Sequence, residues 1–176
     1  GYNTDRMITS NQNAKLKLTR ALLGRSKERS EANAFVAEGV RLVEEALAAG
    51  WRFRFALFGG ELSPRAGALV RNLEGQGIET EEVAAHLLNA MSDTGNTQGV
   101  LAVLELPPAH PLPTPPDFVL IPDQLRDPGN LGTLLRSAAA AGVQLVLLPP
   151  ETTDAFAPKV VRAGMPVCHH LIAHLL

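Results

Sequence analysis

The segment that most constrains this chain is a proline-rich stretch at residues 107–116. Six of its ten residues are proline. Proline lacks a backbone N–H donor, so neither a helix nor a central strand can run through the stretch. Such a segment favours extended polyproline geometry and acts as a semi-rigid spacer. We therefore expect two folded parts, residues 1–106 and 117–176, joined by a linker at 107–116.

The first part shows the alternation of helical and strand patterns that is typical of a small α/β domain. Ser10 or Asn11 is placed to cap the first helix, and Ser63 followed by Pro64 is a clear helix start. The predicted helices span residues 11–23, 39–49, 64–74 and 83–91. The predicted strands span residues 35–37, 53–58, 78–81 and 100–106.

The second part begins with an apolar run, Phe118–Ile121, of the kind found in strands that are buried on both faces. A loop at 123–129, a helix at 130–141 and an apolar strand at 144–148 follow. This strand–helix–strand order predicts a parallel pair. A further strand pattern runs from 167 to 175. Two or three strands with one helix make an incomplete domain, so we expect the chain to stop in the middle of a fold.

Charge is unevenly distributed along the chain. Sixteen Lys and Arg against eighteen Asp and Glu give a net charge of −2. Residues 1–30, however, carry seven basic and two acidic side chains. This basic segment is either a solvated helix face or a surface for phosphates, and composition leaves both open. The acidic segment is the middle, residues 55–106, with seven acids against Arg65 and Arg71.

Other features narrow the class of protein. One cysteine, Cys168, excludes an internal disulfide and a Cys-rich zinc site. No apolar run reaches the ~18 residues that span a bilayer, and no signal peptide is visible. We therefore expect a cytoplasmic protein with no membrane partner. His169 and His170 would point to opposite faces of a strand, so together with His174 they do not predict a metal site.

The stretch that carries chemical information is the loop and helix start at 123–136. It follows a predicted parallel strand, where open α/β sheets bind their ligands. Gly129 and Gly132 permit close backbone approach, and the helix N-terminus attracts negative charge. Asn130 and Arg136 would both lie toward the loop end of one helix. Asn130 is equally suited to cap that helix, and Arg136 to a surface position. The dinucleotide and P-loop glycine patterns are both lacking.

The complete stretch from Asp127 to Arg136 closely resembles the first motif of the SpoU family of RNA ribose methyltransferases. It reads Asp-Pro-Gly-Asn-Leu-Gly, then three residues, then Arg. That family belongs to the SPOUT superfamily of knotted α/β enzymes. Residues 156–164 resemble the family's Pro-Lys-x-x-Arg segment. Residues 7–10 with Lys15, and Arg29 with residues 35–39, are similar to the N-terminal RNA-binding domain of many members. The resemblance implies a ribosomal-protein-like α/β domain followed by part of a parallel-sheet SPOUT domain.

The resemblance also implies an activity: transfer of a methyl group from S-adenosylmethionine to a ribose 2′-hydroxyl in rRNA or tRNA. Arg136 would activate the hydroxyl, mainly electrostatically because an arginine guanidinium keeps its proton in proteins, and Asn130 would position Arg136 or the RNA. Family members usually form homodimers. The residues that we expect to contact RNA are Lys15, Lys17, Arg25, Arg29, Lys159 and Arg162. For Lys159 and Arg162 a structural role is an equal alternative.

One departure from the family pattern stands out. The chain has no Gly-Asn-Glu and no Ser-Leu-Asn-Val segment, so we expect the donor-binding motifs to lie beyond residue 176. These 176 residues alone would then bind S-adenosylmethionine poorly and be inactive. The chain is either a piece of a longer enzyme or a degenerate relative that binds RNA without catalysis. A nucleotide-binding α/β protein with Gly129 and Gly132 around a phosphate is a third alternative.

Overall fold

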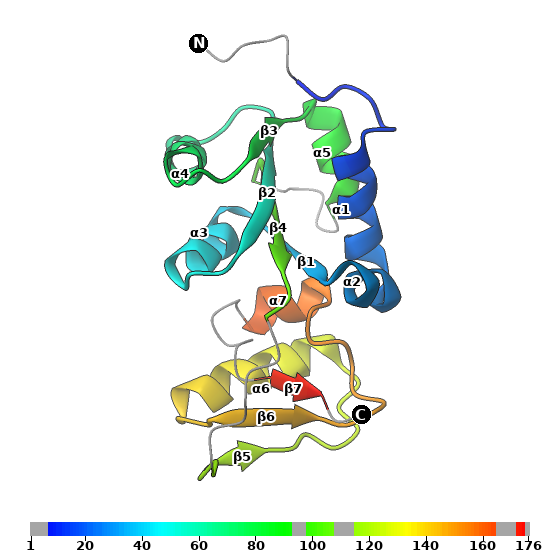
Figure 1. Ribbon diagram of the computed structural model, residues 1–176, viewed down its shortest axis with the longest axis vertical. Helices are drawn as coiled ribbons and strands as arrows, with labels where there is room; N and C mark the ends of the chain where they lie inside the picture. Colours follow the sequence, from blue (N-terminus) through cyan, green and yellow to red (C-terminus); the bar gives the residue numbers. More distant parts are fainter. Residues whose placement is uncertain (1–6, 93–97, 108–114, 165–171, 175–176) are drawn as a thin grey trace. The chain divides into compact units, whose positions relative to one another are not determined.

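The computed structural model describes residues 7–92, 98–107, 115–164 and 172–174. It divides into two compact units, Gly1–Glu105 and Leu106–Leu176, which are coloured from blue to green and from green to red in Figure 1. The division falls directly before the proline-rich stretch.

The N-terminal unit contains a four-stranded sheet and five helices among its described residues. The helices are α1 (Ala14–Gly24), α2 (Ser26–Ala32), α3 (Val40–Ala48), α4 (Pro64–Gly75) and α5 (Ala85–Met91). The strands are β1 (Ala34–Glu38), β2 (Phe53–Phe58), β3 (Thr80–Glu82) and β4 (Val100–Glu105).

The sheet of this unit has the strand order β1–β4–β2–β3. β4 is antiparallel to both of its neighbours, β1 and β2, and β3 is parallel to β2. Figure 1 shows α3 and α4 on one face of the sheet, and α1, α2 and α5 on the other. The unit is therefore a three-layer α/β structure with its sheet buried between helices.

The core of this unit follows from alternation along the strands. β4 lies inside the sheet, and Val100 to Leu104 are all buried. Successive side chains of a strand point to opposite faces, so Leu101 and Val103 join the cluster under α1 and α5, which also holds Leu16, Val36 and Phe55. Strand β4 therefore contributes apolar side chains to the packing on both faces of the sheet.

Most of the elements that we predict in this unit are confirmed, with two corrections. β2 has the predicted bounds, and Ser63 caps α4 by accepting a hydrogen bond from the Ala66 N–H at 3.1 Å. The cap of α1 is Asn13, not Ser10 or Asn11; its Oδ1 accepts from the Lys15 N–H at 2.8 Å. Helix α2 was not predicted, because its sequence SKERSEA has no apolar periodicity.

The C-terminal unit contains the elements β5 (Val119–Leu120), α6 (Pro128–Ala140), β6 (Leu145–Leu148), α7 (Pro158–Gly164) and β7 (Ile172–His174). The strand order is β5–β6–β7, and both pairings are parallel. The parallel pair that we predict from the strand–helix–strand pattern is confirmed. Of the predicted strand at 167–175, the structure describes Ile172–His174.

The strand predicted at Phe118–Ile121 is confirmed for two of its residues, but the burial expected on both of its faces is wrong. Only Val119 and Leu120 form strand β5, and both are half-buried. Phe118 is 47% exposed and Ile121 is 55% exposed. The physical reason is position: in the described sheet β5 pairs with β6 alone, so this run lies at an edge and not between two strands. An apolar run by itself does not distinguish the two positions.

No helix in the described part of the chain is both long and apolar enough to cross a membrane. The described residues also contain no group of three metal-ligating side chains. Cys168, His169 and His170 lie outside the described residues.

Candidate functional site

The candidate site lies where β5 and β6 end, in the C-terminal unit. The loop after β5 leads into α6, and the loop after β6 leads into α7. The two loops are joined by a backbone hydrogen bond, in which the Thr153 N–H donates to the Leu125 carbonyl at 3.0 Å. Since both strands are parallel, the loops that follow them meet at the edge where α/β sheets bind ligands.

Asp127 starts helix α6. Its Oδ1 accepts a hydrogen bond from the Asn130 N–H at 2.7 Å, and Pro128 occupies the first helical turn. A carboxylate in this position satisfies a backbone donor that the helix leaves unpaired and complements the positive end of the helix dipole. Asn130 is therefore not the cap. Its backbone N–H donates to the Asp127 cap, and its exposed side chain is available for another partner.

Arg136 lies farther from the loop than the spacing led us to expect. It is the ninth of the 13 residues of α6. Six residues separate it from Asn130, which is about 9 Å along the axis and roughly 120° around it. Its side chain is exposed and forms no hydrogen bond or ion pair with the described residues. Arg136 is thus a cation available at the surface of this unit.

Gly132 packs against a helix, so the expectation that it admits a ligand is wrong. A Cβ at this position would lie 2.5 Å from Ala163 Cβ, 2.8 Å from Gly164 N and 2.9 Å from Val160 O. All three atoms belong to α7. Because Gly132 has no side chain, the backbones of α6 and α7 approach closely (Figure 1).

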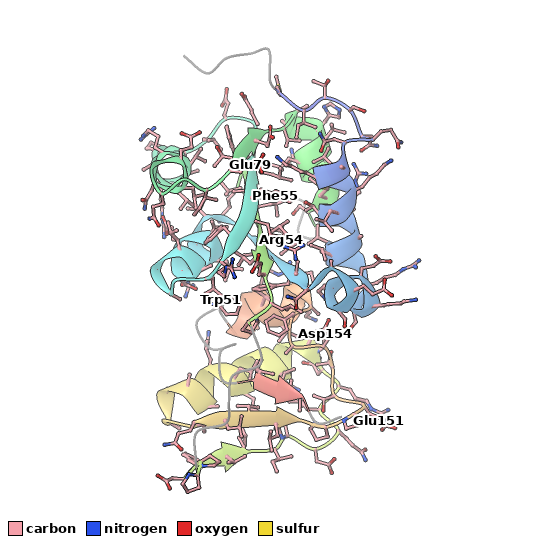
Figure 2. All side chains as sticks on the ribbon, in the orientation of Figure 1. Trp51, Arg54, Phe55, Glu79, Glu151 and Asp154 are labelled. Carbon is pink, nitrogen blue, oxygen red and sulfur yellow. The ribbon has the colours of Figure 1, made fainter. Side chains whose placement is uncertain are left out.

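Helix α7 places two of the predicted RNA-binding residues next to α6. The loop before it is shaped by Asp154, whose Oδ1 accepts from the Phe156 N–H at 2.9 Å, and Figure 2 labels Asp154 in this loop. Lys159 is exposed and Arg162 is half-buried with other interactions. Gly132, which contacts α7, precedes Arg136 by one helical turn. The structure therefore brings Arg136 and the helix that carries Lys159 and Arg162 together.

The two loops hold two non-glycine residues in the left-handed region, Gln124 with φ of 51° and Glu151 with φ of 72°. Glu151 (Figure 2) pairs with Arg126 across the loops, with Oε2 and Nη2 3.3 Å apart. Both partners are largely exposed, so this pair contributes only ~0–1 kcal/mol. Next to it, the Thr152 hydroxyl is buried without a hydrogen-bond partner among the described residues. A buried, unpartnered hydroxyl at this edge fits a polar ligand.

Lys15, predicted to contact RNA, is held by two carboxylates of its own unit. Its Nζ lies 2.6 Å from Glu79 Oε1 and 2.6 Å from Glu81 Oε1, and 5.6 Å from the centre of the Phe55 ring. Burial by itself lowers the pKa of Lys15, but its hydrogen bonds to Glu79 and Glu81 outweigh burial and raise that pKa above its ordinary value. The charge of Lys15 is therefore used within the unit.

Arg29 is a structural residue, which corrects its prediction as an RNA contact. Its side chain is buried, with the residue 5% exposed, and its Nη1 donates to the Leu22 carbonyl at 2.6 Å. Arg54 (Figure 2) likewise donates to the Ala32 carbonyl at 2.6 Å. The two arginines bind carbonyls in the last turns of α1 and α2, where cations are favourable. Lys17 and Arg25 are exposed, as an RNA contact requires.

Sequence reasoning missed two features of the site. Helix α7 has no apolar period long enough to predict, although Pro158 at its start was a visible signal. The capping role of Asp127 was also signalled, by the Asp-Pro pair, but Asn130 competes for the same role in the sequence.

Family models match both units of the chain. Residues 13–102 match the MRM3-like substrate binding domain, and residues 117–174 match the SpoU rRNA Methylase family. Among curated relatives, an uncharacterized tRNA/rRNA methyltransferase of Synechocystis is 36% identical over 89% of this chain and 57% of its own length. The 23S rRNA (guanosine(2553)-2′-O)-methyltransferase RlmP of Bacillus subtilis is 34% identical over 94% of this chain and 63% of its own.

Solved structures give the same result. An rRNA methyltransferase from Sinorhizobium meliloti superposes with a TM-score of 0.77 and 32% identity, covering 97% of this chain and 65% of that one. The SpoU methyltransferase AviRb from Streptomyces viridochromogenes, solved with AdoMet, has a TM-score of 0.75 and 32% identity, covering 92% and 62%.

The chain therefore spans about three fifths of the length of these relatives. The α/β fold class and the family expected from the Asp127–Arg136 string are confirmed. The chain belongs to the SpoU rRNA methylase family, with an MRM3-like substrate binding domain ahead of its methylase region.

Proposed function

We propose that the protein to which this chain belongs methylates a ribose 2′-hydroxyl in rRNA, with S-adenosylmethionine as the methyl donor. The observation that carries the proposal is Arg136 on α6, which is exposed, has no partner among the described residues, and lies one turn beyond the glycine that contacts α7. Relatives at 34% identity are named as rRNA 2′-O-methyltransferases.

Arg136 acts on the ribose hydroxyl in this proposal. A hydroxyl is a weak nucleophile, and negative charge develops on its oxygen as its proton passes to water; the oxygen that has lost its proton is the atom that takes the methyl group. A guanidinium held close to that oxygen stabilises the charge in the transition state. Arginine keeps its proton in proteins, so Arg136 works by its charge and its hydrogen bonds and not as a general base.

Asn130 and the α7 side chains position the RNA. Asn130 precedes Arg136 by about 9 Å along the helix axis, a span that fits contacts with the nucleotide carrying the hydroxyl. Lys159 and Arg162 offer positive charge on the adjoining helix, and Lys17 and Arg25 offer it on the substrate binding domain. Such charges hold phosphates and do not read sequence.

S-adenosylmethionine, when bound, supplies an electrophilic methyl group. The side chain of this chain that we place at the donor site is Thr152, because its buried hydroxyl has no partner among the described residues. A hydrogen bond from this hydroxyl to a polar ligand atom would remove the cost of leaving it unpaired. Homodimeric assembly, implied by the family resemblance, and the cytoplasmic location expected from the sequence belong to the same proposal.

The test measures methyl transfer from radiolabelled S-adenosylmethionine to rRNA by the full-length protein. Ribose methylation is recognised by the resistance of the neighbouring phosphodiester to alkali. We expect Arg136→Ala to lower kcat by about 100-fold or more, as the loss of an electrostatic group does, with circular dichroism unchanged.

Arg71→Ala is the matched control, because Arg71 is an exposed arginine of α4, outside the site. The proposed role of Arg136 is refuted if Arg136→Ala retains full activity. A wild-type protein that binds rRNA but transfers no methyl group would instead be a non-catalytic RNA-binding module.

A further inference from the structure

A cavity of about 570 Å³ lies within the substrate binding domain, far along the sequence from the site described above. It is formed where β1 and β2 end and β4 begins, and its walls include the glycines Gly59, Gly60 and Gly99. Its volume falls within the ~300–1,000 Å³ of small-ligand sites. The polar side chains on its wall are Glu61, Ser63, Arg65, Asn89 and Gln98.

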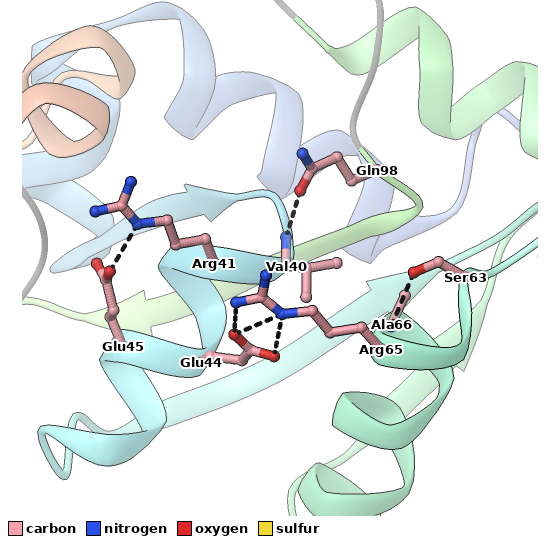
Figure 3. A network of polar contacts seen from close by, with 8 residues as sticks. All are labelled: Val40, Arg41, Glu44, Glu45, Ser63, Arg65, Ala66 and Gln98. Atoms are coloured by element: carbon pink, nitrogen blue, oxygen red, sulfur yellow. Dashed lines mark hydrogen bonds and ion pairs between the residues drawn. The ribbon is translucent and has the colours of Figure 1, made fainter.

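Arg65 is fixed in this wall by Glu44. Its Nε lies 3.0 Å from Glu44 Oε1 and 3.2 Å from Oε2, and its Nη2 also donates to Oε2. The second terminal nitrogen, Nη1, has no partner among the described residues, and Figure 3 shows it turned away from Glu44. A two-pronged pair of this kind fixes the guanidinium plane, so Arg65 presents an oriented donor.

Two side-chain amides line the same cavity. The Gln98 Oε1 accepts from the Val40 N–H at 3.3 Å, which orients the Gln98 amide (Figure 3). The Asn89 side chain is exposed and forms no hydrogen bond with the described residues. At the cavity wall Gly99 has φ of +78°, and a Cβ there would lie 2.7 Å from Leu62 Cδ2. Backbone at Gly99 and the two side-chain amides therefore join Glu61, Ser63 and Arg65 in forming the wall.

Charge decides which ligand the cavity fits. The charges of Glu61 and Arg65 cancel, and Glu44 adds a further negative charge beside Arg65. A bare phosphate would meet a wall with no net positive charge, which is unfavourable. A neutral group with donors and acceptors along one edge matches amides, a carboxylate and an oriented guanidinium. Nucleobases have such edges, and they pair with Asn, Gln, Arg and Glu side chains.

We propose that this cavity receives one unpaired base of the RNA substrate. Proteins that recognise RNA by sequence mostly bind bases of loops and bulges, which can leave the stack and expose their edges. The inference rests on the proposed function, because it takes the substrate to be RNA. It adds a specificity site within the substrate binding domain, separate from the phosphate contacts of Lys17 and Arg25.

The first test titrates the four ribonucleosides, and inorganic phosphate in parallel, into the isotope-labelled 176-residue chain. Nitrogen–proton correlation spectra report each site separately. We expect at least one nucleoside to shift the backbone amides of Gly60 and Gly99 and the side-chain amide of Asn89, whereas phosphate leaves them unmoved. The proposal is overturned if phosphate alone shifts these resonances, or if no nucleoside does.

The second test measures rRNA methylation by full-length variants. We expect Asn89→Ala and Arg65→Gln each to raise KM for RNA about tenfold, the effect of losing one base contact, without changing kcat. Arg71→Gln is the matched control, because Arg71 lies on α4 with Arg65 but outside the cavity wall; its KM stays at the wild-type value.

An unchanged KM in both cavity variants overturns the inference and leaves the proposed function standing. If the wild-type protein transfers no methyl group, the proposed function fails, and the nucleoside titration still decides whether the cavity binds a base.

Discussion

Substituting Gly132 by alanine tests the close contact between α6 and α7. The added methyl carbon would lie 2.5 Å from Ala163 Cβ, 2.8 Å from Gly164 N and 2.9 Å from Val160 O. Two of these three atoms are backbone and cannot rotate away. Forcing a methyl group into such a space costs ~1–3 kcal/mol, and the higher helix propensity of alanine returns ~1 kcal/mol at most. We expect a net loss of up to about 2 kcal/mol in the stability of the C-terminal unit.

Urea unfolding followed by far-UV circular dichroism, with hydrogen exchange of the α6 and α7 amides, measures this loss. Trp51, whose ring contacts Phe35 with centroids 5.2 Å apart, reports on the N-terminal unit, and its transition should not move.

Gly67→Ala in α4 is the matched control. A Cβ there would meet only Arg71 Nη1, at 3.5 Å, which is the end of a flexible side chain. This variant should gain ~0.5–1 kcal/mol from helix propensity alone. If Gly132→Ala also gained stability, the close contact between α6 and α7 would not be what requires glycine at this position.

Three further outcomes follow from the contacts. Asp127→Ala should cost the C-terminal unit about 1 kcal/mol by removing the cap of α6, measured by urea unfolding, and no loss would mean that water caps the helix equally well. Arg29→Ala should cost the N-terminal unit about 1.5–3 kcal/mol by removing a buried charged donor to Leu22, measured by Trp51 fluorescence, whereas an effect on RNA binding alone would contradict its structural role. Lys15 has a raised pKa in the folded state, so its pair with Glu79 and Glu81 stabilises the unit fully below pH 10.5 and less as pH rises through the folded value. Urea unfolding at increasing alkaline pH should show this loss of stability in the wild type, and Lys15→Met should lose less stability over the same pH range. An equal fall of the unfolding free energy with pH in both proteins would refute the stabilising role of this pair.

Much of the fold was predictable because local patterns decided it. Ser63 and Pro64 form the predicted helix start through local capping, and the predicted strand at 53–58 is β2 with the same bounds. The proline-rich stretch stops regular structure for the same local reason, since proline has no N–H to donate. The string ending at Arg136 was specific enough to predict the family.

The candidate site was predictable in its residue types and less so in their roles. Lys15, Arg29, Lys17 and Arg25 look alike in the sequence, yet Lys15 is paired and Arg29 is buried, whereas the other two are exposed. Burial and pairing depend on partners that are distant in the chain: Lys15 meets Glu79 and Glu81, more than sixty residues away. No local pattern contains that information.

The sequence by itself determined that this chain has two parts, which helices and strands most of it forms, and that one loop carries a methyltransferase motif. Tertiary structure decided the rest. It placed the run at Phe118 on a sheet edge, made Gly132 a contact between helices, and gathered Arg65, Asn89 and Gln98 from three segments around one cavity. The physical reason is that capping and periodicity act within a few residues. Strand neighbours, helix contacts and cavities arise only when distant segments pack together.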